Sequence, residues 1–229
     1  MRRFLNLIFI KVPIRFLILS VIVVLLLKWI PIKYTPLMAK RAIEFRSDDS
    51  YSRHQDWIPI EMISSASVKA IIAAEDSRFL SHNGFERGEI RNELERFKNG
   101  EKNIRGCSTI SQQTAKNVFT FGSNTWIRKG LETWFTFLIE KIWGKKRIME
   151  VYLNVAEMGK GIYGIQAAAG YYFDKDAAVL KLSEASSLAI CLPSPLNRSP
   201  DIANEHYTKR KDQITNEANN INIPWRRYY

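Results

Sequence analysis

From about residue 60 onward, the apolar residues of this chain recur at the spacing of an α-helix, and strict alternation of apolar and polar residues is scarce. One apolar stripe comprises Leu131, Trp134, Phe135, Leu138, Ile139 and Ile142. After a break at Gly144, a second stripe comprises Ile148, Val151, Tyr152 and Val155. A further helix is expected over residues 183–192, where Pro193 and Pro195 end it. The pattern predicts a mostly α fold.

Composition limits the chain to one domain of catalytic size with an appendage. Of its 229 residues, 46% are hydrophobic and 25% are charged, which excludes a disordered, a collagenous or a multi-span membrane protein. Cys107 and Cys191 are the only cysteines, too few for a disulfide-stapled scaffold or a cysteine-based zinc site. Whether these two cysteines pair stays open.

An uncharged apolar run covers residues 16–27. As a helix it would be about 18 Å long, which is shorter than a hydrocarbon core of about 30 Å. The run becomes long enough if Lys28 extends its amine to the headgroups, Trp29 lies at the interface and residues 4–10 add apolar length. No small-residue cleavage site follows, which favours an uncleaved transmembrane anchor over a signal peptide. Basic residues on both sides leave its orientation open.

The formal net charge of +11 is unevenly distributed. Residues 1–33 contain no acid and the basic residues Arg2, Arg3, Lys11, Arg15, Lys28 and Lys33. Because this charge flanks the apolar run, anionic lipid headgroups are the expected partner and nucleic acid is not.

A carboxylate ends one of the apolar helical stripes. Val68, Ile71 and Ile72 occupy positions i, i+3 and i+4, and Glu75 occupies i+7. On an inward face this carboxylate would be partly desolvated, which raises its pKa toward the range of a general base. The alternative is a helix end where Glu75 faces solvent or pairs with Arg78.

A polar but almost uncharged stripe follows. Ser108 is the expected N-cap of its helix. The residues that then share one face are Thr109, Gln112, Gln113 and Lys116. Neutral hydrogen-bonding groups with one cation suit a sugar or a phosphate. A plain solvent-exposed face is the alternative.

Glu132 lies beside the apolar stripe that begins at Leu131, so its carboxylate can reach a groove. The alternative is an ion pair with Arg128 or Lys129, which precede it by four and three residues.

Five segments then occur in one order. They read AAEDSRFLSHNG at 73–84, RGCSTISQQTAKN at 105–117, RKGLE at 128–132, KRIMEVYLN at 146–154 and GIYG at 161–164. Together they resemble the glycosyltransferase family 51 peptidoglycan polymerases over about residues 34–200. No penicillin-binding domain follows in this sequence, so the monofunctional branch of the family is expected.

The resemblance implies a mostly α, lysozyme-like domain over residues 36–200. A cytoplasmic N-terminus and transmembrane helix (1–35) would precede it, and a polar tail (201–229) would follow. The protein would be single-pass in the cell inner membrane, with its catalytic domain in the periplasm. Its substrate would be lipid II, whose C4 hydroxyl attacks C1 of a growing glycan. A polyprenyl pyrophosphate leaves, and β-1,4-linked strands result.

The resemblance also assigns roles to residues. Glu75 would be the general base, and Glu132 a second catalytic carboxylate that orients or polarises the donor. The implied substrate-binding residues are Asp76, Ser108, Thr109, Gln112, Gln113, Lys116, Asn117, Arg128 and Lys129. Of these, the lysines and the arginine would neutralise the pyrophosphate.

The resemblance implies no obligatory cofactor. Binding of a divalent metal, Mg²⁺ or Mn²⁺, at the pyrophosphate stays open. The implied partners are lipid II, the growing glycan strand, the lipid bilayer and other cell-wall synthesis proteins.

The chain departs from the family pattern at Asn124, where the family usually has an arginine that helps to bind the pyrophosphate. Two alternatives to a polymerase stay open. One is a peptidoglycan-cleaving enzyme on the same scaffold. Such an enzyme needs an acid with a raised pKa, and it does not need a cation that binds pyrophosphate. The other is a membrane-anchored scaffold with an inactive site.

The charged residues 85–105 align with the family's mobile jaw.

Overall fold

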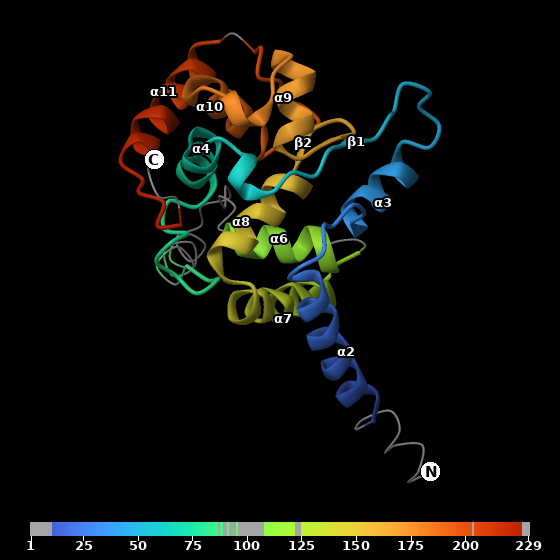
Figure 1. Ribbon diagram of the computed structural model, residues 1–229. Helices are drawn as coiled ribbons and strands as arrows, with labels where there is room; N and C mark the ends of the chain where they lie inside the picture. Colours follow the sequence, from blue (N-terminus) through green and yellow to red (C-terminus); the bar gives the residue numbers. More distant parts are fainter. Residues whose placement is uncertain are drawn as a thin grey trace.

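The computed structural model describes residues 11–86, 88, 91, 95, 108–121, 125–202 and 204–225. These residues are mostly helical, as predicted (Figure 1). The helices are α2 (Val12–Leu27), α3 (Pro36–Glu44), α4 (Ser65–Glu75), α6 (Ile110–Phe119), α7 (Trp126–Ile142), α8 (Gly144–Val155), α9 (Ile165–Phe173), α10 (Leu182–Cys191) and α11 (Glu205–Asn219). The strands are β1 (His54–Gln55), β2 (Glu157–Gly159) and β3 (Ile162–Tyr163), and short 3-10 helices cover Ile60–Met62 and Ala177–Val179.

Two groups of helices meet near the end of α4. Helices α4, α10 and α11 pack against one another, and so do α6, α7 and α8. The hydroxyl of Ser64 caps α4 by accepting a hydrogen bond from the backbone N–H of Ser67. The predicted inward stripe of α4 is fully buried and comprises Val68, Ile71 and Ile72. This packing fixes the helix whose last residue is Glu75.

Two predicted helix boundaries are confirmed. The break at Gly144 separates α7 from α8, and this glycine has a φ of 74°, which favours glycine over other residues. The helix predicted over 183–192 is α10. Cys191 at its end is a buried free thiol whose pKa burial raises to about 12. Cys107 lies outside the described residues.

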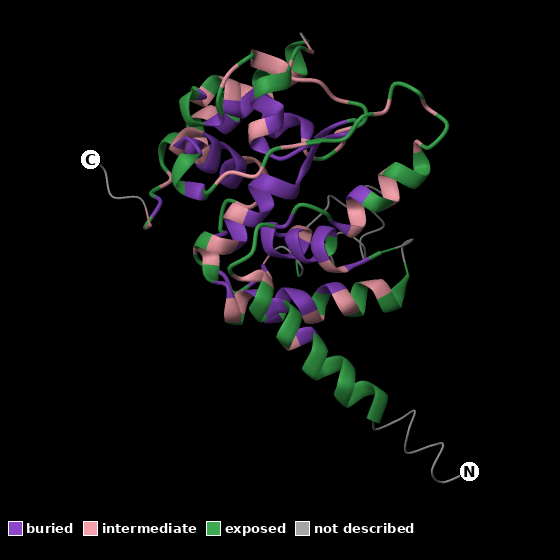
Figure 2. Ribbon diagram, turned by 45° about the vertical axis from the view of Figure 1, so that its right-hand side comes forward, coloured by how far each residue is buried: buried purple, intermediate pink, exposed green. Residues whose placement is uncertain are grey.

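Helix α2 extends away from the domain, and most of its residues are exposed (Figure 2). Its large exposed side chains are Val12, Ile14, Phe16, Leu17, Ile18, Leu19, Ile22, Val23, Leu25 and Leu26. Its C-terminal half is attached to the domain: the indole N–H of Trp134 donates to the hydroxyl of Ser20 (3.0 Å), and that of Trp143 donates to the carbonyl of Val24 (2.7 Å).

The sequence predicts a transmembrane helix within residues 1–35. Helix α2 has 16 residues, and no helix in the described part of the chain combines the length and the apolar character needed to cross a membrane. Residues 1–10 lie outside the described part. The side of α2 that faces the domain forms hydrogen bonds with Trp134 and Trp143. The apolar run alone is shorter than the hydrocarbon core of a bilayer.

The C-terminal segment predicted as a polar tail forms helix α11, whose N-cap is Asn204. Only Ile214 and Ala218 are buried on it, against α4 and α10. Two buried residues in fifteen give a weak apolar pattern, which explains why periodicity did not predict this helix. The helix extends the folded domain beyond residue 200.

The three short strands form a sheet in the order β1-β3-β2, with β1 parallel and β2 antiparallel to β3. Gly164 follows β3 and begins α9 with φ 82° and ψ 161°. A Cβ atom at this position would lie 2.7 Å from the carbonyl oxygen of Asn154. Both the backbone conformation and the close approach require glycine here.

We expect Gly164→Ala to lower the free energy of unfolding by at least about 2 kcal/mol, because it adds backbone strain and a steric clash. Thermal unfolding followed by circular dichroism should show a Tm about 4–8 °C lower. Gly170→Ala is the matched control, because nothing lies within 4 Å of a Cβ at this α9 position and alanine favours a helix. An equal loss of Tm in both variants would contradict the prediction.

Candidate active site

Glu75 is the last residue of α4, and its carboxylate is half-buried. Desolvation raises its pKa, while a hydrogen bond from Gln113 and the positive charges of Arg210 and Lys116 lower it. The inward-facing interpretation of Glu75 therefore agrees with the structure. A partly desolvated carboxylate near neutral hydrogen-bond donors is suited to accept a proton.

The side-chain amide of Gln113 holds the carboxylate of Glu75. Its Nε2 donates to Oε2 of Glu75 at 2.7 Å and contacts the carbonyl of Ser108 at 3.3 Å. Its Oε1 accepts a hydrogen bond from the hydroxyl of Tyr152 at 3.2 Å. Because Tyr152 is fully buried on α8, this chain of hydrogen bonds connects the carboxylate to the core and restricts its movement.

Asp76 connects the end of α4 to the start of α6. Its carboxylate accepts hydrogen bonds from Nε2 of His82 (2.9 Å) and from the backbone N–H of Ile110 (3.0 Å). Nδ1 of His82 accepts from the backbone N–H of Gly84 (3.0 Å), which places the ring proton on Nε2. The carboxylate predicted to bind substrate thus holds backbone and ring donors in this structure.

The N-cap of α6 is Thr109, so the predicted N-cap Ser108 is wrong by one residue. Thr109 and Gln112 form a capping box: the hydroxyl of Thr109 accepts from the N–H of Gln112, and the side-chain oxygen of Gln112 accepts from the N–H of Thr109. This reciprocal pair needs a spacing of three residues, which Ser108 does not have with a glutamine. Asn117 is buried on the same helix.

A cation cluster, which we define as Lys116, Arg128 and Lys129, surrounds the second carboxylate. Glu132 is only 3% exposed. Its Oε1 lies 2.6 Å from Nζ of Lys129, and its Oε2 lies 3.4 Å from the guanidinium of Arg128. Both ion pairs considered as the alternative for Glu132 are therefore present. Thr125 caps this end of α7 by accepting from the N–H of Arg128.

Lys116 connects the two carboxylates electrostatically. It is an α6 residue that keeps contact with solvent. Desolvation lowers its pKa, the negative charges of Glu132 and Glu75 raise it, and Arg128 and Lys129 lower it. Lys116 is thus within electrostatic reach of both Glu75 and Glu132, which brings Glu75 and the cation cluster close to each other.

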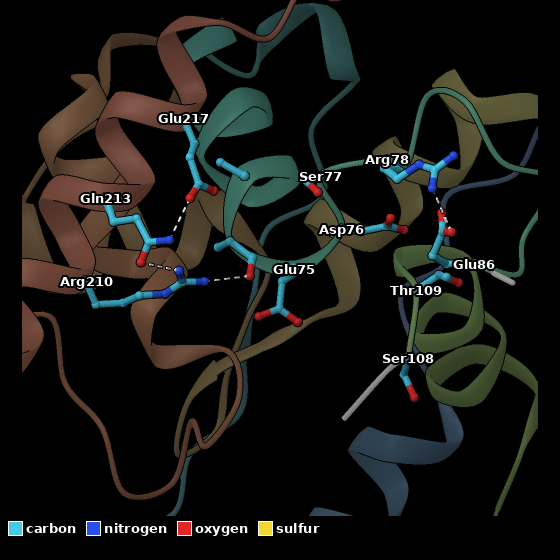
Figure 3. A pocket seen from close by; sticks show the side chains of 12 residues that line it. Glu75, Asp76, Ser77, Arg78, Glu86, Ser108, Thr109, Arg210, Gln213 and Glu217 are labelled. Carbon is cyan, nitrogen blue, oxygen red and sulfur yellow. Dashed lines mark hydrogen bonds and ion pairs between the residues drawn. The ribbon is translucent and has the colours of Figure 1, made fainter. Parts of the chain in front are cut away.

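A pocket of about 200 Å³ opens beside Glu75 (Figure 3). The side chains around it come from α4, from the loop after it, from the start of α6 and from α11, and they include Asp76, Arg78, Glu86, Ser108, Thr109, Arg210, Gln213 and Glu217. The α11 residues were not predicted as site residues. The sequence offers only a weak indication: Arg210 shares a helix face with Ile214, four residues later, but only two residues of α11 are buried.

The described residues include no group of three or more His, Cys, Asp or Glu side chains that could hold a metal ion. The carboxylate at the cation cluster, Glu132, is already paired with Lys129 and Arg128. A divalent metal bound mainly by the pyrophosphate therefore stays a prediction. Asn124 and most of the charged stretch 85–105 lie outside the described residues.

Comparison with known proteins identifies the family. The family model described as Transglycosylase matches residues 41–219, a range that includes α11. A protein of Pseudomonas entomophila (strain L48) named biosynthetic peptidoglycan transglycosylase is 43% identical over 206 residues, which cover 90% of this chain and 87% of the relative. A protein of the same name from Caulobacter vibrioides is 48% identical over 194 residues, covering 85% and 82%. The chain therefore belongs to the transglycosylase family.

Proposed function

We propose that this chain is a peptidoglycan glycosyltransferase on a lysozyme-like helical domain, which polymerises lipid II into β-1,4-linked glycan strands for the bacterial cell wall. One observation supports this most directly. A partly desolvated carboxylate, Glu75, and the cation cluster share one site through Lys116. Transfer of a sugar from a pyrophosphate carrier needs both a base for the acceptor and fixed positive charge for the leaving group.

The reaction joins the C4 hydroxyl oxygen of a lipid II acceptor to C1 of the growing glycan. Glu75 takes the proton of the hydroxyl as the new bond forms, and Gln113 holds the carboxylate in place. The bond between C1 and the pyrophosphate oxygen breaks, and the cation cluster stabilises the negative charge that the polyprenyl pyrophosphate carries away.

Glu132 organises the cation cluster. Its ion pairs with Lys129 and Arg128 keep two long side chains in place at the first turn of α7. Side chains that are already positioned need no reorganisation when charge develops on the leaving group. The role proposed for Glu132 is therefore to orient the donor-binding cations.

The protein is proposed to work at the inner membrane, with its domain on the periplasmic side. Two features support contact with lipid: the exposed apolar side chains of α2, and Trp126 and Ile127 at the start of α7, which are 93% and 78% exposed. Helix α2 packs against α7. Large exposed apolar surfaces and interfacial tryptophan are typical of membrane contact. A substrate held by a lipid is most easily met by an enzyme at the same surface.

Incubation of the purified protein with labelled lipid II in detergent tests the proposal. We expect long glycan products on gels, and we expect moenomycin, an inhibitor that occupies the donor site of this enzyme class, to abolish them. Release of soluble fragments from purified sacculi, without synthesis from lipid II, would instead support the cleaving enzyme. A folded protein with neither activity would support the inactive scaffold.

A further inference from the structure

Arg210 reaches from α11 to the end of α4, next to Glu75 (Figure 3). One guanidinium nitrogen donates to the carbonyl oxygen of Ala74 at 3.2 Å, and the other donates to Oε1 of Gln213 at 2.9 Å. Nε2 of Gln213 in turn donates to Glu217 at 2.7 Å. Within the described residues, Arg210 forms no ion pair with a carboxylate. Its positive charge is thus fixed by neutral oxygen atoms.

The charges that face Glu75 come from several elements. Helix α11 contributes Arg210, α6 contributes Lys116, and the residue after α4, Asp76, contributes a negative charge. Helix α8 contributes Tyr152, whose pKa burial raises well above its usual value, so that its hydroxyl stays neutral.

The other charged residues of the pocket already have partners. Arg78 is paired with Glu86, and Glu217 accepts the hydrogen bond from Gln213. Arg210 and Lys116 are therefore the cations that act on Glu75.

Lys116 and Arg210 differ in how they relate to the leaving group. Lys116 also acts on Glu132 and belongs to the cation cluster, so a bound pyrophosphate takes up part of its charge. Arg210 lies on the other helix group, on the side of the pocket formed by α4 and α11. Its effect on Glu75 does not depend on the leaving group.

We propose that Arg210 is a positioning residue for Glu75: it fixes the end of α4 through the carbonyl of Ala74, and its charge keeps the Glu75 carboxylate ionised so that it can act as the base. The proposal rests on the proposed function, because it assigns Arg210 to the same reaction. It places the chain beyond residue 200 in the active site.

The direction of the pH effect follows from the charges. Burial raises the pKa of Glu75, and Arg210 lowers it. When the charge of Arg210 is removed, this pKa rises further, so the base is protonated at a higher pH. Activity lost in the variant at low pH should return as the pH increases above the new pKa.

The test compares pH profiles of kcat/KM for lipid II polymerisation in Arg210→Gln, Arg210→Lys and the wild-type protein. The acidic limb of each profile is the part in which activity falls as Glu75 becomes protonated. We expect it to lie about one pH unit higher in Arg210→Gln than in the wild-type protein, and to stay near the wild-type pH in Arg210→Lys. Glutamine keeps an N–H donor but removes the charge, and Tm values check that the fold is kept. Lys209→Gln is the matched control, since Lys209 is an exposed neighbour paired with Glu205; its limb should not move.

A second measurement does not depend on activity. The ¹³C chemical shift of the Glu75 carboxyl carbon, assigned by its absence in Glu75→Gln, reports the pKa of Glu75 directly and should show the same upward shift in Arg210→Gln. An equal loss of activity at every pH, an unchanged carbon titration, or the same shift in Lys209→Gln would overturn the role of Arg210. Failure of the wild-type protein to polymerise lipid II would overturn the proposed function and leave the carbon titration as the test of the charge effect.

Discussion

Glu75→Gln is expected to reduce glycan synthesis from lipid II by about 10²–10⁴-fold, the range that a general base contributes. Glutamine has nearly the same shape as glutamate, so it can stay at the end of α4 beside Gln113. It cannot take the proton from the acceptor hydroxyl. The loss should appear in kcat, measured with labelled lipid II at saturating concentration, while Tm stays close to that of the wild-type protein.

Glu205→Gln is the matched control for this experiment, because it makes the same chemical change at an exposed glutamate at the start of α11. Its activity should equal that of the wild-type protein. A fully active Glu75→Gln variant would refute the assignment of Glu75 as the base. An inactive variant with a strongly lowered Tm would show that the carboxylate stabilises the fold instead.

The predicted position of Glu75 agrees with the structure for a simple physical reason. A helix that buries one face shows this in its sequence, because apolar residues recur every three or four positions. The stripe in α4 was therefore visible, and so was the carboxylate at its end. The ion pairs of Glu132 were also predictable, as an alternative, since they depend only on spacing within one helix.

The local interactions at the start of α6 were less predictable. Thr109 and Gln112 are polar residues in a stripe that resembles a ligand-binding face, but their side chains hydrogen-bond to each other's backbone N–H. Threonine and glutamine serve either purpose equally well, so the sequence alone does not separate them. Asp76 presents the same ambiguity, because its partner Ile110 is 34 residues later in the chain.

The contribution of α11 was not predicted at all. Its contact with the active site joins Arg210 to Ala74, which are 136 residues apart, and such contacts leave no periodic signal. The helix also buries few of its residues and is stabilised by its contacts with α4 and α10. Tertiary packing rather than helix propensity gives most helices of this kind their stability.

Lys116→Ala is the second variant with a large expected effect, a loss of about 10²–10³-fold in kcat. The pyrophosphate leaving group gains negative charge as its bond to C1 breaks, and Lys116 is the member of the cation cluster within reach of Glu75 as well as Glu132. Desolvation lowers the pKa of Lys116, so its ammonium group loses its proton at a lower pH than that of an unperturbed lysine. Wild-type activity should therefore decline on the alkaline side as the pH rises through this pKa, and Lys116→Ala should lack that decline.

The acidic and alkaline limbs of the pH profile of activity distinguish the role of Lys116 from a general loss of positive charge. Because Lys116 also lowers the pKa of Glu75, its removal should move the acidic limb upward at the same time as the alkaline limb disappears. Lys209→Ala removes a positive charge at the surface and should change neither limb. A polymerase that keeps its full rate without Lys116 would show that the leaving group is stabilised elsewhere. Release of fragments from sacculi that is indifferent to Lys116→Ala would instead indicate a cleaving enzyme, because a sugar leaving group needs a proton and not a fixed cation.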